Sequence, residues 1–291
     1  MADINDLPDD TDQQKKPRYA AGMVLKLIRF HQPVGTLLLM WPPLWCLLLL
    51  TEDWPPIDLM VVFILGAFIM RSAGCVINDI TDRKLDAKVE RTKTRPLASG
   101  EMPLTHAFVI LVLLLLIALI IAIYLGPKVV LASIPAVLLV ILYPWMKRIT
   151  FWPQLCLGLT FNYGVLLASI ALTGGIHPTA WWLYAAAVCW TLGYDTIYGF
   201  QDIKDDEKIG VKSTARLFKH RPQLAVGAMY GLAAIGLYIS AGVLPAALFA
   251  VHCLWQVGRL QIDDSELCKQ LFKRNGTELG LIIWLSILFT A

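Results

Sequence analysis

Apolar residues form nine long stretches of the chain, and polar or charged segments separate them. The stretches are residues 33–50, 57–78, 105–125, 127–146, 152–173, 179–200, 223–241, 243–258 and 277–291. Most are long enough for a helix that crosses a hydrocarbon layer of about 30 Å at about 1.5 Å per residue. The pattern predicts an all-α, polytopic membrane protein with about nine transmembrane helices. Residues 1–22 are expected to form a polar tail, and residues 23–291 a single domain.

Composition supports a lipid environment for most of this surface. Of the 291 residues, 57% are hydrophobic and only 16% are charged, and the mean hydropathy is +0.62. That is more apolar surface than a soluble core of this size can bury, so the lipid bilayer is the first expected partner. No Lys/Arg-rich run interleaved with aromatic residues suggests a nucleic-acid surface, and no nucleic-acid partner is expected.

The basic residues lie almost entirely on one side of the predicted membrane. Of the 25 Lys and Arg residues, only Lys128 falls in the connections that follow the first, third, fifth and seventh stretches. Because Lys and Arg are retained on the cytoplasmic side of membranes, the N-terminus and the long polar loops at 79–104, 201–222 and 259–276 are predicted to be cytoplasmic. The C-terminus is then predicted to be periplasmic, in a bacterial inner membrane.

A first acidic motif follows the second stretch. If the helix continues through it, Asn78, Asp82 and Asp86 lie one turn apart on one face, with Asp79 one turn before Asp82. Carboxylate and amide oxygens are the ligands that Mg²⁺ prefers, and like charges on one face repel each other unless a cation neutralises them. The alternative is a solvated helix end whose acids pair with nearby Lys and Arg.

A second acidic motif follows the sixth stretch. Asp195, Tyr198, Asp202 and Asp206 follow helical spacing there, and Asp195 is preceded by an apolar run. A carboxylate at membrane depth is costly, so it indicates a functional site, although a salt bridge to Arg71 or Arg148 would also explain it. Two acidic motifs four stretches apart predict two metal subsites that face one diphosphate, with Mg²⁺ as the cofactor.

Basic side chains are also needed, because a diphosphate is strongly negative. Arg71 lies two helical turns before Asn78 within an apolar stretch, so an uncompensated charge there would be costly. Arginine suits bidentate binding of a phosphate or a carboxylate. The other candidate substrate-binding residues are Lys147, Arg148, Lys93, Arg95 and Lys212, although simple positive-inside charge explains Lys93 and Arg95 equally well.

These motifs resemble those of the UbiA superfamily of intramembrane prenyltransferases. The signature NDxxDxxxD stands here as Asn78, Asp79, Asp82 and Asp86. The second aspartate-rich signature resembles the stretch from Tyr194 to Asp206, with its trailing Gly210-x-Lys212-Ser213-Thr214. Four further stretches resemble the 4-hydroxybenzoate polyprenyltransferases of ubiquinone biosynthesis: Pro33-x-Gly35 with Trp41-Pro42, Arg71-x-Ala73-Gly74-Cys75, Thr94-Arg95-Pro96-Leu97, and Tyr143-Pro144 with Lys147-Arg148.

The resemblance implies a helical bundle around a central cavity, capped by cytoplasmic loops. The implied substrates are polyprenyl diphosphate and 4-hydroxybenzoate, and the implied reaction joins the prenyl group to the ring carbon ortho to the hydroxyl. By resemblance, Asn78, Asp82, Asp86, Asp202 and Asp206 bind Mg²⁺ and diphosphate, with Asp79 a further candidate ligand.

Asp195 is the residue considered for orienting or deprotonating the phenol. Tyr198 is a second catalytic candidate, because an aromatic ring can shelter an allylic cation. Arg148 is implied to be an essential cation. We expect it to hold the acceptor carboxylate, and we expect Arg71, aligned with Asn78, to face the diphosphate.

Two other classes of protein were weighed. An ion-coupled transporter also uses paired carboxylates, but near the bilayer midplane, whereas these acids lie at the ends of stretches. A phosphatidyl-alcohol transferase pattern begins with Asp-Gly and contains Ala-Arg, which this motif lacks. The sequence predicts neither the prenyl length nor the oligomeric state.

Overall fold

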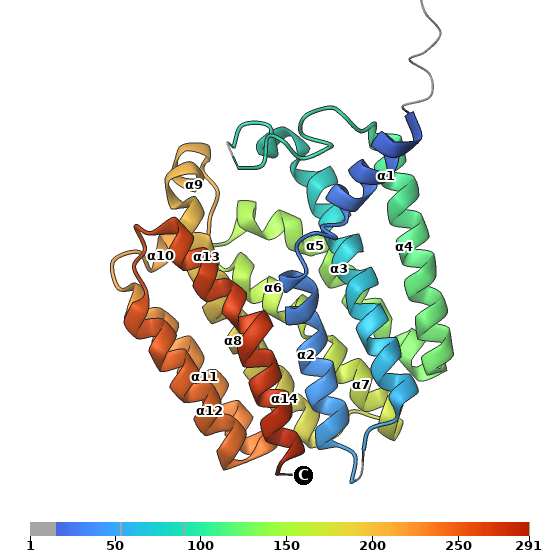
Figure 1. Cartoon of the computed structure of the whole chain (residues 1–291), viewed down its shortest axis with the longest axis vertical. Coiled ribbons are helices and arrows are strands. Elements are labelled where there is room, and N and C mark those ends of the chain that lie inside the picture. The colour runs from blue at the N-terminus through green and yellow to red at the C-terminus, as the bar shows by residue number, and fades with distance from the viewer. Residues whose placement is uncertain (1–15, 53, 90, 291) are drawn as a thin grey trace, which may run out of the picture.

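The fold is a bundle of helices whose long axes run roughly together (Figure 1). The computed structural model describes residues 16–52, 54–89 and 91–290, and these contain helices and connecting loops but no strands. The predicted all-α membrane fold is confirmed. The tail predicted for residues 1–22 lies outside the described residues as far as residue 15, and a helix begins at Lys16.

Each predicted stretch corresponds to one helix or to adjoining helices. In chain order these are α2 (Val34–Leu49), α3 (Ile57–Asp86), α4 (Leu104–Leu125), α5 (Pro127–Ile149), α6 (Pro153–Phe161) with α7 (Gly164–Thr173), α8 (Pro178–Gly199), α11 (Pro222–Ala241), α12 (Val243–Arg259), and α13 (Ser265–Arg274) with α14 (Gly280–Leu288). The shorter helices are α1 (Lys16–Leu27), α9 (Ile203–Ile209) and α10 (Thr214–Leu217).

The outer surface of the bundle is apolar. Helices α4, α5, α11 and α12 expose large hydrophobic side chains such as Ile120, Leu131, Leu232 and Leu254. In the described residues, the segments α3, α4, α5, α6 with α7, and α11 are each long and apolar enough to cross a membrane, while α2 and α12 are shorter apolar helices. The chain is therefore a multi-pass membrane protein, because such a surface is stable only against lipid.

Helix α8 lies at the centre of the packing and contacts α6, α11 and α13. Its Trp190 and Tyr194 are buried, and the Trp190 ring centroid is 5.2 Å from that of Trp45 on α2. The Trp190 indole also donates a hydrogen bond to Asn275 Oδ1 at 2.8 Å. This helix carries Asp195 near its end, so the core fixes the position of the second acidic motif.

The predicted start of the last stretch was wrong. The last stretch was predicted to begin at 277 after a long loop, but α13 begins at Ser265 and continues through a π-helical turn, Asn275–Leu279, into α14. The sequence predicts a loop there because the segment contains many charged residues. Only Cys268 and Leu271 of α13 are buried. The fifth stretch agrees with the segment Pro153–Thr173. Between its two helices, α6 and α7, Asn162 donates hydrogen bonds to Gly158 O and Ala187 O.

The polar segments gather at one end of the bundle. Helices α1, α9 and α10 and the loop of residues 87–103 lie there, and the C-terminal end of α14 lies at the opposite end (Figure 1). The segment predicted as a long loop at 201–222 contains a 3-10 turn (Phe200–Asp202), α9 and α10. Helix α3 does continue through the first acidic motif to Asp86, as the spacing of its acids required.

Candidate functional site

A cavity of about 1510 Å³ is lined by residues of this polar end and by residues within the bundle. Both acidic motifs line it, one at the end of α3 and the other at and beyond the end of α8. The lining includes all six predicted metal ligands, Asn78, Asp79, Asp82, Asp86, Asp202 and Asp206, together with Arg71, Arg95, Lys147, Asp195, Tyr198 and Lys212. Beyond them the cavity becomes apolar, where it is lined by residues of α3, α4 and α5 such as Phe63, Ala122 and Val129.

The acids of α3 are paired with basic side chains from other segments. Asp82 is fully buried, and the ammonium group of Lys147 on α5 makes a hydrogen-bonded ion pair with its carboxylate. Asp86 accepts a hydrogen bond from Arg95 Nη1 at 2.7 Å. In the structure, basic side chains therefore neutralise the negative charge of acids that are predicted to bind Mg²⁺.

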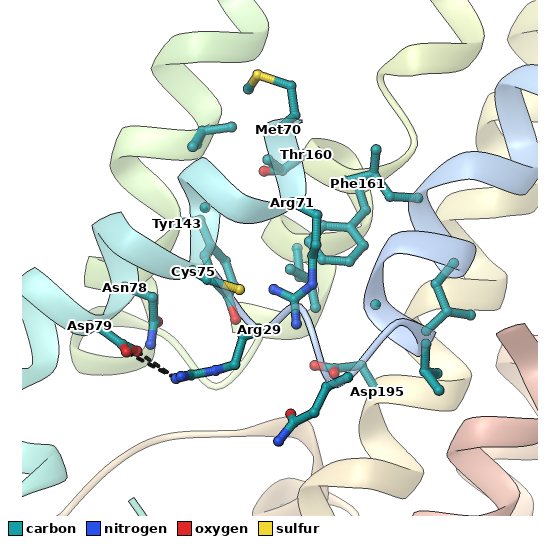
Figure 2. A pocket seen from close by; sticks show the side chains of 18 of the residues that line it. Arg29, Met70, Arg71, Cys75, Asn78, Asp79, Tyr143, Thr160, Phe161 and Asp195 are labelled. Carbon is teal, nitrogen blue, oxygen red and sulfur yellow. Dashed lines mark hydrogen bonds and ion pairs between the residues drawn. The ribbon is translucent and has the colours of Figure 1, made fainter. Parts of the chain in front are cut away.

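Asp79 has a different environment from the other acids of the motif. Its side chain is 1% exposed, and Arg29 Nη2 lies 2.8 Å from its Oδ1 and 3.0 Å from its Oδ2. Arg95 Nη1 adds a third contact with Oδ1 at 3.1 Å. Asp79 therefore links Arg29, between α1 and α2, to α3, as Figure 2 shows, and also contacts Arg95 in the loop after α3.

In the second motif, one acid is paired and another is not. Arg91 donates hydrogen bonds to Asp202 Oδ2 at 2.7 Å and to the Tyr198 hydroxyl at 2.6 Å. The Asp206 side chain has no ion-pair partner among the residues that the structure describes, although Arg216 donates to its backbone carbonyl oxygen at 3.4 Å. Burial, together with the neighbouring Asp202, raises the pKa of Asp206 to about 7, and burial also raises the pKa of Asp202.

The donor set suits Mg²⁺, but it is divided between two walls of the cavity. No group of three His, Cys, Asp or Glu side chains among the described residues could hold a metal ion by itself. Mg²⁺ is commonly held by one or two carboxylates and completes its shell with water and substrate phosphate oxygens. Asp82 and Asp86 on one wall, and Asp202 and Asp206 on the other, fit that kind of coordination.

Deeper in the cavity, Arg71 and Asp195 face each other. Figure 2 shows the Arg71 guanidinium directed toward the Asp195 carboxylate, with Tyr143 and Phe161 beside it. Cζ of Arg71 is 5.7 Å from the Phe161 ring centroid, and its buried Nε has no hydrogen-bond partner in the described part of the chain. A cation with unused donors at the base of a cavity is suited to bind an anionic group of a ligand.

Three of the predicted substrate-binding residues have other surroundings than expected. Arg148 and Lys93 are exposed and do not line the cavity; Arg148 Nη2 is 3.2 Å from Thr81 O and 3.5 Å from Asp82 Oδ1. Lys212 lines the cavity, but its ammonium group donates to Ile149 O at 3.0 Å and its backbone N–H donates to Lys147 O at 2.9 Å. It thus caps carbonyl groups at the end of α5.

Sequence reasoning missed two arginines of this site. Arg91 lies in the loop after α3, where its sequence position resembles any positive-inside charge. Arg29 follows α1 and has a positive φ of 57°, which is uncommon for a residue other than glycine and is often found at functional sites. No sequence signal indicated that either guanidinium would reach an aspartate.

Comparison with known proteins places the chain among prenyltransferases. The sequence matches the UbiA prenyltransferase family over residues 39–284. A relative from Shewanella amazonensis named 4-hydroxybenzoate octaprenyltransferase is 45% identical over 217 residues, which cover 75% of this chain and 74% of the relative. A relative of the same name from Shewanella loihica is 39% identical over 272 residues, covering 90% of this chain and 94% of the relative.

Solved structures share the fold. A UbiA homologue from Aeropyrum pernix K1 has a TM-score of 0.74 at 23% identity and covers 88% of this chain and 97% of its own. A UbiA homologue from Archaeoglobus fulgidus, bound to GPP and Mg²⁺, has a TM-score of 0.67 at 18% identity and covers 90% of this chain and 99% of its own.

Proposed function

The chain belongs to the UbiA prenyltransferase family, and we propose that it transfers a polyprenyl group from its diphosphate to 4-hydroxybenzoate. The bond forms at the ring carbon ortho to the hydroxyl, and the product is an intermediate of ubiquinone biosynthesis. The observation that supports this function best is a single cavity that combines acids from two motifs, an inner cation and an apolar extension. These match a diphosphate with its metal, an aromatic carboxylate and a prenyl chain.

The diphosphate belongs at the polar end of the cavity. Asn78, Asp82, Asp86, Asp202 and Asp206 would hold Mg²⁺, which when bound neutralises the diphosphate and favours its departure. Lys147, Arg91 and Arg95 lie against these acids and are placed to bind phosphate oxygens once the acids bind the metal. Asp79 is left out of the ligand set, because two arginines already occupy both of its oxygens.

The acceptor belongs at the inner end, and the two arginines exchange the roles expected from the sequence. Arg71 lines the cavity beside Asp195, so its guanidinium would hold the carboxylate of 4-hydroxybenzoate. Arg148 lies outside the cavity, contacts Asp82 and stacks on Trp145 with Cζ 5.1 Å from the ring centroid. It would therefore support the diphosphate end through Asp82.

We propose that two residues near the end of α8 act on the reacting atoms. Asp195 would orient the phenol hydroxyl and accept a proton as the ring attacks the allylic cation. The Tyr198 ring, which packs 4.4 Å from that of Phe272 between centroids, would face the allylic carbon and stabilise its positive charge. The apolar extension near Phe63 and Val129 would receive the prenyl chain.

The orientation in the membrane follows from charge. The loops at 79–104 and 201–222, which adjoin the acidic motifs, hold 12 of the 25 Lys and Arg residues, whereas only Lys128 lies in the connections predicted for the opposite side. This asymmetry supports a cytoplasmic site in a bacterial inner membrane, with the C-terminus in the periplasm.

The function is tested with purified protein, Mg²⁺, a polyprenyl diphosphate and a panel of phenolic acids. We expect a product with the mass of prenylated 4-hydroxybenzoate, formed faster than from other phenols. Turnover of another acid, with none of 4-hydroxybenzoate, would refute the proposed acceptor. An Asp206→Asn variant serves as the negative control.

A further inference from the structure

Gly35, in the first turn of α2, lies directly against the guanidinium of Arg71. A Cβ atom built on Gly35 would be 2.2 Å from Arg71 Nε, 2.7 Å from Nη2 and 2.8 Å from Cζ. Real Cβ atoms essentially never approach another heavy atom within 3.0 Å. Any side chain at position 35 would therefore occupy the space in which the guanidinium now lies.

Backbone geometry does not explain this glycine. Gly35 is within a helix and is not among the glycines with positive φ, so alanine could adopt its conformation. Alanine is also the better helix former of the two residues. The close approach of Arg71 is then the feature of the structure that requires glycine here.

Packing against neighbouring groups helps to set the position of the Arg71 guanidinium. Its buried Nε has no hydrogen-bond partner among the described residues, and its Cζ is 5.7 Å from the Phe161 ring centroid. Gly35 and Phe161 both line the cavity with Arg71. A side chain added at position 35 would therefore displace the guanidinium from this position.

We propose that Gly35 is a positioning residue for the acceptor, because the absence of a side chain there lets the Arg71 guanidinium lie where it binds the aromatic carboxylate. This inference rests on the proposed function of Arg71. Gly35 then affects the selectivity for acceptors that bear a carboxylate, and it does so through Arg71. It has no effect on binding of the prenyl diphosphate.

The test substitution is Gly35→Ala. The added methyl group meets the far end of a flexible side chain, so the helix can be retained while the guanidinium moves. Loss of a charge-assisted contact should raise the KM for 4-hydroxybenzoate by about ten- to hundredfold, while the KM for the prenyl diphosphate stays within about twofold. Gly231→Ala, in α11, is the matched control, because a Cβ there meets nothing within 4 Å.

A neutral acceptor separates positioning from general damage. Wild-type protein should prefer 4-hydroxybenzoate to 4-hydroxybenzamide, and Gly35→Ala should abolish most of that preference. In an Arg71→Gln background, Gly35→Ala should add little, since both changes remove the same contact.

Failure of the proposed function would appear in the wild-type arm, as absence of product from 4-hydroxybenzoate. Failure of the inference would appear only in the variants. The inference would be overturned if Gly35→Ala lowered kcat/KM equally for both acceptors, or if its effect on kcat/KM added fully to that of Arg71→Gln. It would also be overturned if the Gly35→Ala protein melted well below the Gly231→Ala protein, because Gly35 would then serve helix packing alone.

Discussion

Asp79 and Asp206 should respond in opposite ways to the same change. Both carboxylates are predicted metal ligands in the sequence, and both line the cavity. In the structure, however, Asp79 is bound by two arginines and Asp206 has no ion-pair partner among the described residues. Replacing each by asparagine removes a negative charge and keeps nearly the same shape. The comparison therefore isolates what each charge does.

For Asp79→Asn, we expect loss of stability. Removing one partner of a buried ion pair costs about 3–5 kcal/mol. The side chains of Arg29 and Arg95 are 14% and 20% exposed, so water can partly solvate them and the lower limit, about 3 kcal/mol, is the better expectation. At roughly 2–4 °C per kcal/mol, the melting temperature should fall by roughly 6–12 °C.

For Asp206→Asn, we expect an unchanged or slightly higher melting temperature, because a half-buried carboxylate without an ion-pair partner among the described residues has been removed. Turnover should nevertheless be lost, along with binding of Mn²⁺ used as a probe for Mg²⁺. Melting is followed by tryptophan fluorescence in detergent, and Mn²⁺ binding by electron paramagnetic resonance. An Asp79→Asn protein that melts like wild type but no longer binds Mn²⁺ would refute the assignment of Asp79 as an anchor.

Three further outcomes are expected. Exhaustive chelation should abolish turnover and added Mg²⁺ should restore it, because without the metal the acids of the two motifs would repel the diphosphate. Full activity after chelation would exclude a role for Mg²⁺ in turnover. Arg71→Lys should raise the KM for the aromatic acid, whereas Arg148→Lys should raise the KM for the prenyl diphosphate. Steady-state kinetics with each substrate varied in turn measures both values, and the reverse pattern would support the roles expected from the sequence. A cysteine at Ser99 should resist impermeant thiol reagents in intact cells, and labelling from outside would contradict the orientation.

The hydrophobic pattern was sufficient to predict the helical bundle and to place both acidic motifs at the ends of apolar helices. Helical spacing placed Asn78, Asp82 and Asp86 on one face, and α3 does continue to Asp86. Pattern failed at α13, because a helix that buries little has few apolar residues to indicate it.

The partners of the acids could not be predicted. Asp79 and Asp82 are three residues apart on one helix, and what distinguishes them is which basic side chain arrives from elsewhere. Arg29 and Arg91 lie in irregular segments, and hydrophobic periodicity does not predict the conformation of such segments. The exchange of roles that we propose for Arg71 and Arg148 has a similar cause, since sequence distance from the acids did not reveal which arginine lines the cavity.

The proposed reaction forms a carbon–carbon bond at a defined ring position, and isotopic labelling tests this directly. Purified protein is given Mg²⁺, a polyprenyl diphosphate and 4-hydroxybenzoate that carries deuterium on both ring carbons next to the hydroxyl-bearing carbon. We expect a product that has lost one of its two deuterium atoms, with one diphosphate released for each product formed. A prenylated product that keeps both deuterium atoms would contradict it, because the prenyl group would then be on an oxygen or at another ring position.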